Sequence, residues 1–176
     1  MEVDPEKLKI FEVGNMLHGF VVEVMRDERH KDIELLESEF PFKMEMKNFV
    51  VSGRVDDLIL IKSDSKKVLV EVKSTRNVDF IEEPQSNHVA QLMFYMVASD
   101  IHNGVILYID KNNLHTKVFE VSFDEFKAAE TIDRFNFLHE HLKEDKLPFA
   151  EAKKVSDMSW MCKYCEYIEK CNKEDK

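Results

Sequence analysis

Glycine and proline are scarce in this chain, which has four of each among its 176 residues. That scarcity excludes collagen-like and low-complexity proteins, which depend on those two residues. Long apolar runs are missing as well, because no stretch approaches the roughly 18 residues that a membrane-spanning helix needs. The sequence does not open with a basic segment followed by an apolar one, so we expect no secretory signal.

Cysteine is rare, and the three cysteines all lie between residues 162 and 171. Three thiols cannot all pair within one chain, so the pattern is not a disulfide framework. A reducing compartment suits such a protein, and the expected localisation is therefore cytoplasmic.

Negative charge dominates, with a formal net charge of −10 at pH 7. This charge argues against a protein that coats nucleic acid by bulk attraction. It does not exclude a nuclease, because clustered carboxylates can hold metal ions while a local basic strip contacts the substrate. Candidates for such a strip are Arg54, Lys73, Arg76, Lys153 and Lys154.

Hydrophobic residues make up 44% of the chain, which is enough for a folded core. The length fits one domain over 1–176, with 155–176 as a C-terminal lobe that binds a metal or a cluster. Periodicity and turn residues predict its elements. These are a helix over 8–26, a charged loop or frayed helix end over 27–39, hairpin strands 47–61 and 68–73, a helix capped by Ser86 or Asn87 and ending near Ser99, strands 105–109 and 116–121, and a helix from a Ser122–Glu125 capping box to about Lys143. This order predicts an α/β fold, a mixed sheet flanked by helices.

Three charged residues stand in the two hairpin strands, with Asp56 in the first and Glu71 and Lys73 in the second. Side chains alternate between faces along a strand, so Glu71 and Lys73 share a face, and pairing around the turn brings Asp56 near Glu71. Adjacent carboxylates repel unless a cation intervenes, and a hard divalent cation with oxygen ligands meets that need. Mg²⁺ or Mn²⁺ bound this way can activate water and clamp a phosphate, with Lys73 orienting the nucleophile.

The alternative for these charges is a surface strand pair, which is common for isolated Glu-x-Lys triplets. The apolar flanks LILI and VLV argue for function, because charges within buried strands usually have one. Asp57 points to the opposite face from Asp56. Of the two, Asp56 is the one that fits the Gly53-x-x-Asp56 motif of the family resemblance given next.

Several motifs, taken in order, resemble the RecB-type branch of the PD-(D/E)XK nucleases. A glycine four residues before a helical histidine resembles that branch's first motif, and the tail resembles the C-terminal cysteines of the CRISPR-associated Cas-four exonucleases. Those enzymes use an iron–sulfur cluster to hold the chain end against the nuclease core. The motifs are Gly14-Asn-Met-Leu-His18, Gly53-x-x-Asp56, Glu71-Val72-Lys73, Gln91-Leu-Met-Phe-Tyr95 and Cys162-x-x-Cys165-x5-Cys171. The resemblance covers nearly the whole chain.

The resemblance implies a PD-(D/E)XK restriction-endonuclease-like core with a metal-dependent active site. By position, His18, Asp56 and Glu71 would bind Mg²⁺ or Mn²⁺. The Val72 backbone carbonyl would complete that shell, and Lys73 would assist the attacking water. Asp56, Glu71 and Lys73 would thus form the catalytic set.

The same resemblance implies that Gln91 and Tyr95 support the site and contact DNA. Their spacing places both on one face of a helix, and His88 lies on that face three residues before Gln91. Arg54, within the Gly53-x-x-Asp56 motif, is a further candidate for contact with the substrate.

The cysteine tail has a chelating spacing, with Cys162 and Cys165 around one centre and Cys171 close behind. Soft thiolate ligands suit an iron–sulfur cluster or zinc. The resemblance favours a 4Fe–4S cluster, and zinc is the rival. The relatives carry a fourth cysteine before the helical histidine, whereas residues 1–17 here contain none. A histidine as fourth ligand is the alternative, and the candidates are His30, His139 and His141.

By resemblance, then, the chain is a metal-dependent deoxyribonuclease acting on single-stranded ends. The implied role is exonuclease trimming of DNA for CRISPR spacer acquisition, with DNA and CRISPR integration proteins as partners and no membrane. One alternative is a RecB-like repair, viral or mobile-element nuclease. Another is a non-catalytic DNA-binding assembly subunit, and a third is a zinc-binding scaffold.

Overall fold

The computed structural model describes residues 5–27, 29 and 31–174. The chain divides into two compact units, the first reaching Ile132 and the second beginning at Asp133. Within the described residues, no helix is both long enough and apolar enough to cross a membrane.

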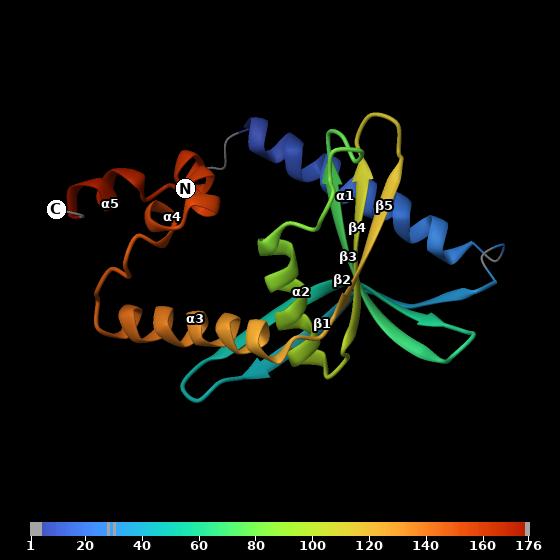
Figure 1. The fold of residues 1–176 in the computed structure, drawn as a ribbon, viewed down its shortest axis with the longest axis horizontal. Coiled ribbons are helices and arrows are strands. Elements are labelled where there is room, and N and C mark those ends of the chain that lie inside the picture. Colours follow the sequence, from blue (N-terminus) through green and yellow to red (C-terminus); the bar gives the residue numbers. More distant parts are fainter. Residues whose placement is uncertain (1–4, 28, 30, 175–176) are drawn as a thin grey trace. The chain divides into compact units, whose positions relative to one another are not determined.

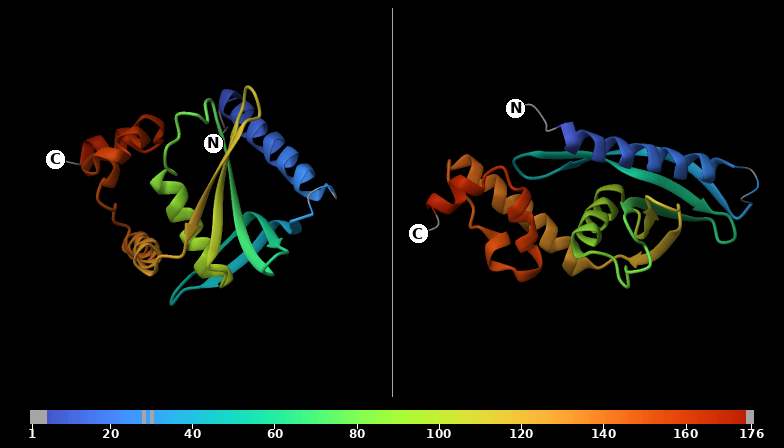
Figure 2. Two further views of the ribbon diagram at one scale, coloured as in Figure 1. Left: turned by 45° about the vertical axis from the view of Figure 1, so that its right-hand side comes forward. Right: turned by 90° about the horizontal axis from the view of Figure 1, so that it is seen from above.

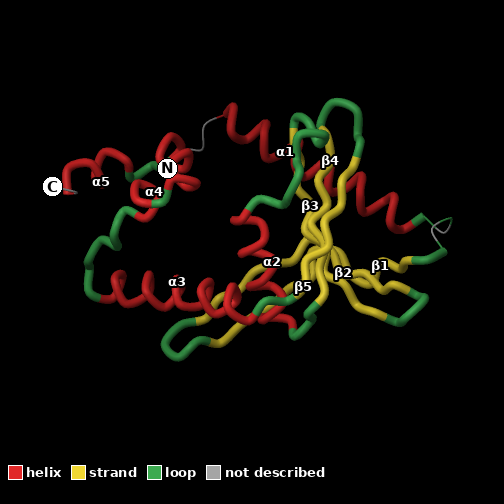
Figure 3. Tube along the Cα trace, in the orientation of Figure 1, coloured by secondary structure: helices red, strands yellow, loops and turns green. Residues whose placement is uncertain are grey.

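A mixed sheet of five strands forms the centre of the first unit, in the order β1-β2-β3-β4-β5 (Figure 3). Only the β3–β4 pairing is parallel, and the other three pairings are antiparallel. The bounds are β1 Ile33–Glu45, β2 Val50–Ile61, β3 Lys66–Thr75, β4 Asn103–Asp110 and β5 Thr116–Ser122. The predicted α/β class, mixed sheet and hairpin of β2 with β3 are confirmed.

Two helices cover opposite faces of this sheet. Helix α1 (Pro5–Arg26) lies on one side and α2 (Ser86–Ser99) on the other, as the view from above shows (Figures 1 and 2). On the α1 side, Val21 and Met25 pack in one buried cluster with strand residues such as Ile109. On the α2 side, Leu92, Met96 and their neighbours form the larger buried cluster. Because α2 also supplies the crossover between parallel strands, its position is set by the sheet on which it packs.

Strand β1 corrects the prediction of a loop or helix end over 27–39. It begins at Ile33, and a bulge between Leu35 and Glu37 shifts its register with β2. The shift interrupts the alternation that identifies a strand in sequence, and Glu39 takes a positive φ of 52°. Pro41 is tolerated because β1 is an edge strand.

The helix caps also differ from prediction. The residue preceding α2 is Gln85, with no side-chain cap, so neither Ser86 nor Asn87 acts as one. Helix α3 (Glu125–Lys143) is capped by Asp124, whose Oδ1 accepts hydrogen bonds from the amides of Phe126 and Lys127 at 3.0 and 3.2 Å. Ser122, the predicted cap, still belongs to β5. Pairing with Asn103 keeps Ser122 in the sheet, so Asp124 is the capping residue that is left at the start of the helix.

Gly53 on β2 has a packing role that connects the sheet to α2. It pairs across the ladder with Phe42, and a Cβ at this position would lie 2.7 Å from the ring atom Cζ of Phe42. The absence of that carbon lets the ring lie over the strand and contact Phe94 and Tyr95, with ring centroids 5.7 and 5.2 Å away. The glycine of the Gly53-x-x-Asp56 motif therefore makes room for the ring that packs against α2.

The second unit contains the end of α3 and three short helical segments, α4 (Glu151–Lys154), η1 (Ser156–Tyr164) and α5 (Ile168–Glu174). An ion pair of 2.7 Å joins Arg134 to Glu151, and the rings of Phe137 and Phe149 meet edge to face. The segment 155–176, predicted as a lobe, lies within this unit.

Candidate active site

The candidate site lies where β2 and β3 separate. Their last backbone pairing toward this end joins Asp57 to Val70. One residue beyond it, Asp56 Oδ2 accepts a hydrogen bond from the Val72 amide at 2.8 Å. A side-chain carboxylate thus takes the place of a backbone acceptor, which holds Asp56 between the two strands.

Glu71 follows on the same face of β3 and is only 1% exposed. Its Oε1 is paired with the Lys73 ammonium, whereas its Oε2 is buried and has no hydrogen-bond partner among the described residues. Burial, and then the charge of Asp56, raises the pKa of Glu71 to about 7. Burial also raises the pKa of Asp56, although the Val72 amide acts in the opposite direction. Two carboxylates therefore share a poorly solvated space with one lysine.

His18 of α1 approaches from the other face of the sheet. Its Nε2 lies 3.0 Å from Oδ2 of Asp57, which is completely buried. This hydrogen bond is the largest of the influences that raise the pKa of His18, and the charges of Asp57 and Asp56 act in the same direction against burial. Asp57 does point away from Asp56, as alternation predicts, but it contacts the candidate histidine.

Sequence reasoning set Asp57 aside, because the motif spacing selected its neighbour. Two signals together could have found it. Alternation assigns Asp57 to the face opposite Glu71, and the apolar stripe of the first helix requires that helix to cover one face of the sheet. A buried carboxylate on that face needs a donor, and His18 is the polar residue within the stripe.

Helix α2 presents Gln91 and Tyr95 to the carboxylate face. The Gln91 side-chain amide donates to the Tyr95 hydroxyl at 2.7 Å. Burial raises the pKa of Tyr95, and the charges of Glu71 and Asp56 add to that effect. The structure therefore brings the Gln91–Tyr95 pair near the two carboxylates.

One turn earlier on α2, His88 contacts Tyr108 of β4, a residue that the sequence analysis did not select. The Tyr108 hydroxyl lies 2.8 Å from His88 Nδ1 and accepts a hydrogen bond from the Gln85 amide at 3.0 Å. Burial, and then the charge of Lys73, lowers the pKa of His88 to about 4. A tyrosine within the apolar strand VILYI was the available signal, since a buried hydroxyl needs a partner.

The family model for the PD-(D/E)XK nuclease superfamily matches residues 12–172. The chain belongs to this superfamily. The proteins of this superfamily are metal-dependent nucleases, which are hydrolases that typically use Mg²⁺ or Mn²⁺ and act on DNA. No curated protein matches the chain.

A solved structure has the same fold as this PD-(D/E)XK chain. The crystal structure of SSO0001 superposes with a TM-score of 0.57 at 19% sequence identity. The match covers 88% of this chain and 66% of that one. At this identity the likeness shows the fold alone.

The donor set of this PD-(D/E)XK site suits a divalent cation, although the described residues contain no ready-made group of three or more His, Cys, Asp or Glu side chains around one point. Glu71 Oε2 and Asp57 Oδ1 are both buried without a partner in the described part of the chain. An orphaned carboxylate oxygen beside a second carboxylate is a hard ligand in need of positive charge.

The other residues singled out in the sequence have the following places and contacts. Arg54 is exposed and forms an ion pair with Glu39 of β1. Cys162 lies in the last turn of η1, and Cys165 directly follows that helix. The Cys165 amide donates to the Cys162 carbonyl at 3.4 Å, and Cys171 lies in α5. All three thiols are free. His141 contacts the Phe137 carbonyl, His139 lies on the same helix, and His30 is outside the described residues.

Proposed function

We propose that the chain is a metal-dependent deoxyribonuclease whose catalytic residues are Asp56, Glu71 and Lys73. The buried Glu71 Oε2 atom carries this proposal, because it has no partner among the described residues and lies beside a second carboxylate. A structural carboxylate would be hydrogen-bonded or replaced by an apolar residue. Binding a cation would offset the cost of burying this carboxylate, and it would explain why the carboxylate is there.

The proposed metal ligands are His18, Asp56, Glu71 and the Val72 carbonyl. When bound there, Mg²⁺ or Mn²⁺ would lower the pKa of water and neutralise phosphate charge. The Val72 amide holds the Asp56 carboxylate in place by a 2.8 Å hydrogen bond, so this ligand is oriented before any cation binds.

Lys73 is proposed to orient the attacking water and to neutralise the phosphate. Its ammonium is paired with Glu71 Oε1, and its side chain is 25% exposed. The ammonium therefore joins the buried carboxylates to the solvent side, where a substrate would arrive. A positive group at that boundary stabilises the charge that develops on a phosphate in hydrolysis.

Asp57 is proposed to orient His18 as a metal ligand. When the Asp57 carboxylate accepts a proton from Nε2 of His18, the lone pair of that ring is left on Nδ1 for a cation. Metal-binding histidines commonly donate their second ring nitrogen to a carboxylate in this way. Gln91 and Tyr95 are proposed to support the carboxylates and to contact DNA, as their position on α2 allows.

The proposed biological role is exonuclease trimming of single-stranded DNA ends for CRISPR spacer acquisition, in the cytoplasm and with CRISPR integration proteins as partners. The motif order and the cysteine tail support this role, and the superfamily match supports the nuclease activity alone. Cys162, Cys165 and Cys171 are proposed to bind a 4Fe–4S cluster. Arg54 is proposed to contact the substrate.

The proposal is tested by Mn²⁺-dependent degradation of single strands labelled at the 5′ or the 3′ end. Variants Asp56→Ala, Glu71→Gln and Lys73→Ala should each lose on the order of 10²–10⁴-fold in rate. Asp64→Ala, in the exposed β2–β3 turn, is the matched control and should keep full activity. Full activity in any of the three site variants, at unchanged melting temperature, would contradict the assignment. Comparing the two labels also establishes cleavage polarity.

A further inference from the structure

A row of polar side chains crosses the sheet beyond the proposed catalytic residues. In the parallel pairing of β3 with β4, Lys73 lies opposite Tyr108, and in the antiparallel pairing of β4 with β5, Tyr108 lies opposite Lys117. Paired residues project from the same face of a sheet. The two lysines therefore flank the tyrosine on the face that α2 covers, one strand away on either side.

His88 lies over the centre of this row, with its Nδ1 atom 2.8 Å from the Tyr108 hydroxyl. That hydroxyl accepts the Gln85 amide proton and still has its own proton to donate to His88 Nδ1. When it does so, the histidine proton is on Nε2. The lowered pKa of His88, about 4, agrees with a neutral ring next to Lys73.

The second ring nitrogen of His88, Nε2, has no partner within the described part of the chain, where Tyr108 is the hydrogen-bond partner of the ring. The residue is half-buried. A histidine held by a tyrosine at one nitrogen keeps the other for a ligand.

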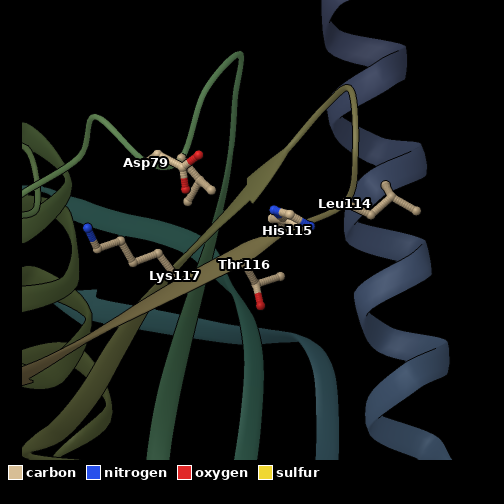
Figure 4. Close-up of a pocket in the computed structure, with 6 residues that line it drawn as sticks. Asp79, Leu114, His115, Thr116 and Lys117 are labelled. Carbon is tan, nitrogen blue, oxygen red and sulfur yellow. The ribbon is translucent and has the colours of Figure 1, made fainter.

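Lys117 adds positive charge at the far end of the row. Its ammonium lies 5.8 Å from the centre of the Phe119 ring, and within the described part of the chain no carboxylate forms an ion pair with it. Lys117 also lines an open pocket with His115, Thr116 and the carboxylate-bearing Asp79. Figure 4 shows the Lys117 side chain extended away from Leu114, toward the side of the sheet where α2 lies.

We propose that His88 and Lys117 form a subsite for a backbone phosphate of the bound DNA strand, adjacent to the phosphate that Lys73 contacts. This inference rests on the proposed nuclease function and extends it to the course of the DNA strand, which runs from β3 across β4 to β5. A net charge of −10 repels DNA, so an unpaired lysine and an unused donor beside the catalytic lysine are a local exception. Asp79 limits the subsite on the turn side, since a carboxylate repels a phosphate.

The first test measures binding of a fluorescent single-stranded oligonucleotide to the full chain in EDTA, which prevents cleavage. Lys117→Ala should weaken binding about 5- to 20-fold and reduce the slope of log affinity against log salt by about 0.7, the value for one phosphate of a single strand. Lys66→Ala, an exposed lysine at the start of β3, is the control and should change neither quantity. Unchanged affinity and slope for Lys117→Ala would overturn its role.

The second test uses two substitutions of His88 that separate its two nitrogens. Glutamine can place its amide near the position of Nε2, whereas asparagine can place its amide near Nδ1 and keep a contact with Tyr108. His88→Gln should retain DNA affinity within about twofold, and His88→Asn should weaken it about 5- to 20-fold without changing the salt slope, because a neutral donor releases no counterion. The reverse ranking would show that His88 only supports Tyr108 and would overturn the proposal.

Failure of this inference can be distinguished from failure of the proposed function. If the wild-type protein degrades DNA with Mn²⁺ and the His88→Asn and Lys117→Ala variants bind DNA as tightly as it does, the subsite is absent and the protein is still a nuclease. A chain without nuclease activity whose DNA binding depends on both residues has the subsite and contradicts the catalytic proposal.

Discussion

His18 Nε2 lies 3.0 Å from Asp57 Oδ2, so the first helix is joined to β2 by the aspartate that follows Asp56. Asp57 is completely buried on the α1 face, and Asp56 is held on the other side by the Val72 amide. The two consecutive aspartates thus project from opposite faces of one strand. Asp57 is hydrogen-bonded to α1, and Asp56 belongs to the group proposed to bind a cation.

Asp57→Asn should lower the pKa of His18 toward its ordinary value, because the charge that favours the imidazolium is lost. It should also reduce Mn²⁺ affinity about 10- to 100-fold, the usual effect of removing the carboxylate that orients a histidine ligand. NMR titration of the His18 ring and calorimetric Mn²⁺ binding check the two effects. Asp64→Asn in the exposed turn is the control, and unchanged Mn²⁺ affinity in Asp57→Asn would sink the orienting role.

The protein without divalent metal should lose stability as pH rises from 4.5 to about 7 through Glu71. The unfolded chain releases the Glu71 proton near its ordinary pKa of 4.5, whereas the folded chain keeps it until about 7. The folded state therefore binds more protons in that window, and stability falls with pH. His18 acts in the same direction, its contribution being present below 6.5 and lost as pH rises through its raised pKa.

Glu71→Gln isolates this effect. In EDTA, its free energy of unfolding should exceed that of the wild type by an amount that grows with pH across the window, reaching at most about 3 kcal/mol. The pKa of His88 is lowered to about 4, so its contribution to the free energy of unfolding is lost as pH falls below 6.5. This loss is the same in the wild type and in Glu71→Gln. Urea unfolding at several pH values measures the difference. A difference that is independent of pH would contradict the raised pKa of Glu71.

Gly53→Ala should destabilise the fold by about 1–3 kcal/mol, because its Cβ would overlap the Phe42 ring. That ring cannot move freely, since Phe94 and Tyr95 contact it. Adding Phe42→Leu should restore part of the loss. Gly19→Ala is the matched control: a Cβ there meets nothing within 4 Å, and alanine is the better helix former, so thermal unfolding should show equal or greater stability.

Replacing the tail cysteines by serine should remove bound metal and lower the melting temperature. Metal–thiolate bonds form only when the site is folded, so their free energy adds to that of folding. Protein purified without oxygen should be brown and contain iron if the proposed cluster is present. Elemental analysis distinguishes the two metals. Stoichiometric zinc without iron would show that the cysteines bind zinc and not a cluster, and it would leave the nuclease assignment unchanged.

Local patterns in the sequence were sufficient for much of the fold. The β2–β3 hairpin and the bounds of α2 follow from alternation, turn residues and helical periodicity, which are short-range properties of the chain. Strand β1 was missed because the bulge at Leu35 and Glu37 interrupts the alternation. The cap of α3 was misassigned because two acceptors, Ser122 and Asp124, stand close together, and strand pairing decides which of them is outside the sheet.

The sequence by itself determined which residue types could do the chemistry and which face of a strand each occupies, because the two-residue period of a strand is a property of the backbone. It could therefore separate Asp56 from Asp57. Only the tertiary structure decided that Asp57 contacts His18, 39 residues away, and that His88 contacts Tyr108, 20 residues away. Those contacts depend on how α1 and α2 pack on the sheet. The same packing removes water from Glu71, and this desolvation raises its pKa and leaves Oε2 without a partner in the described chain.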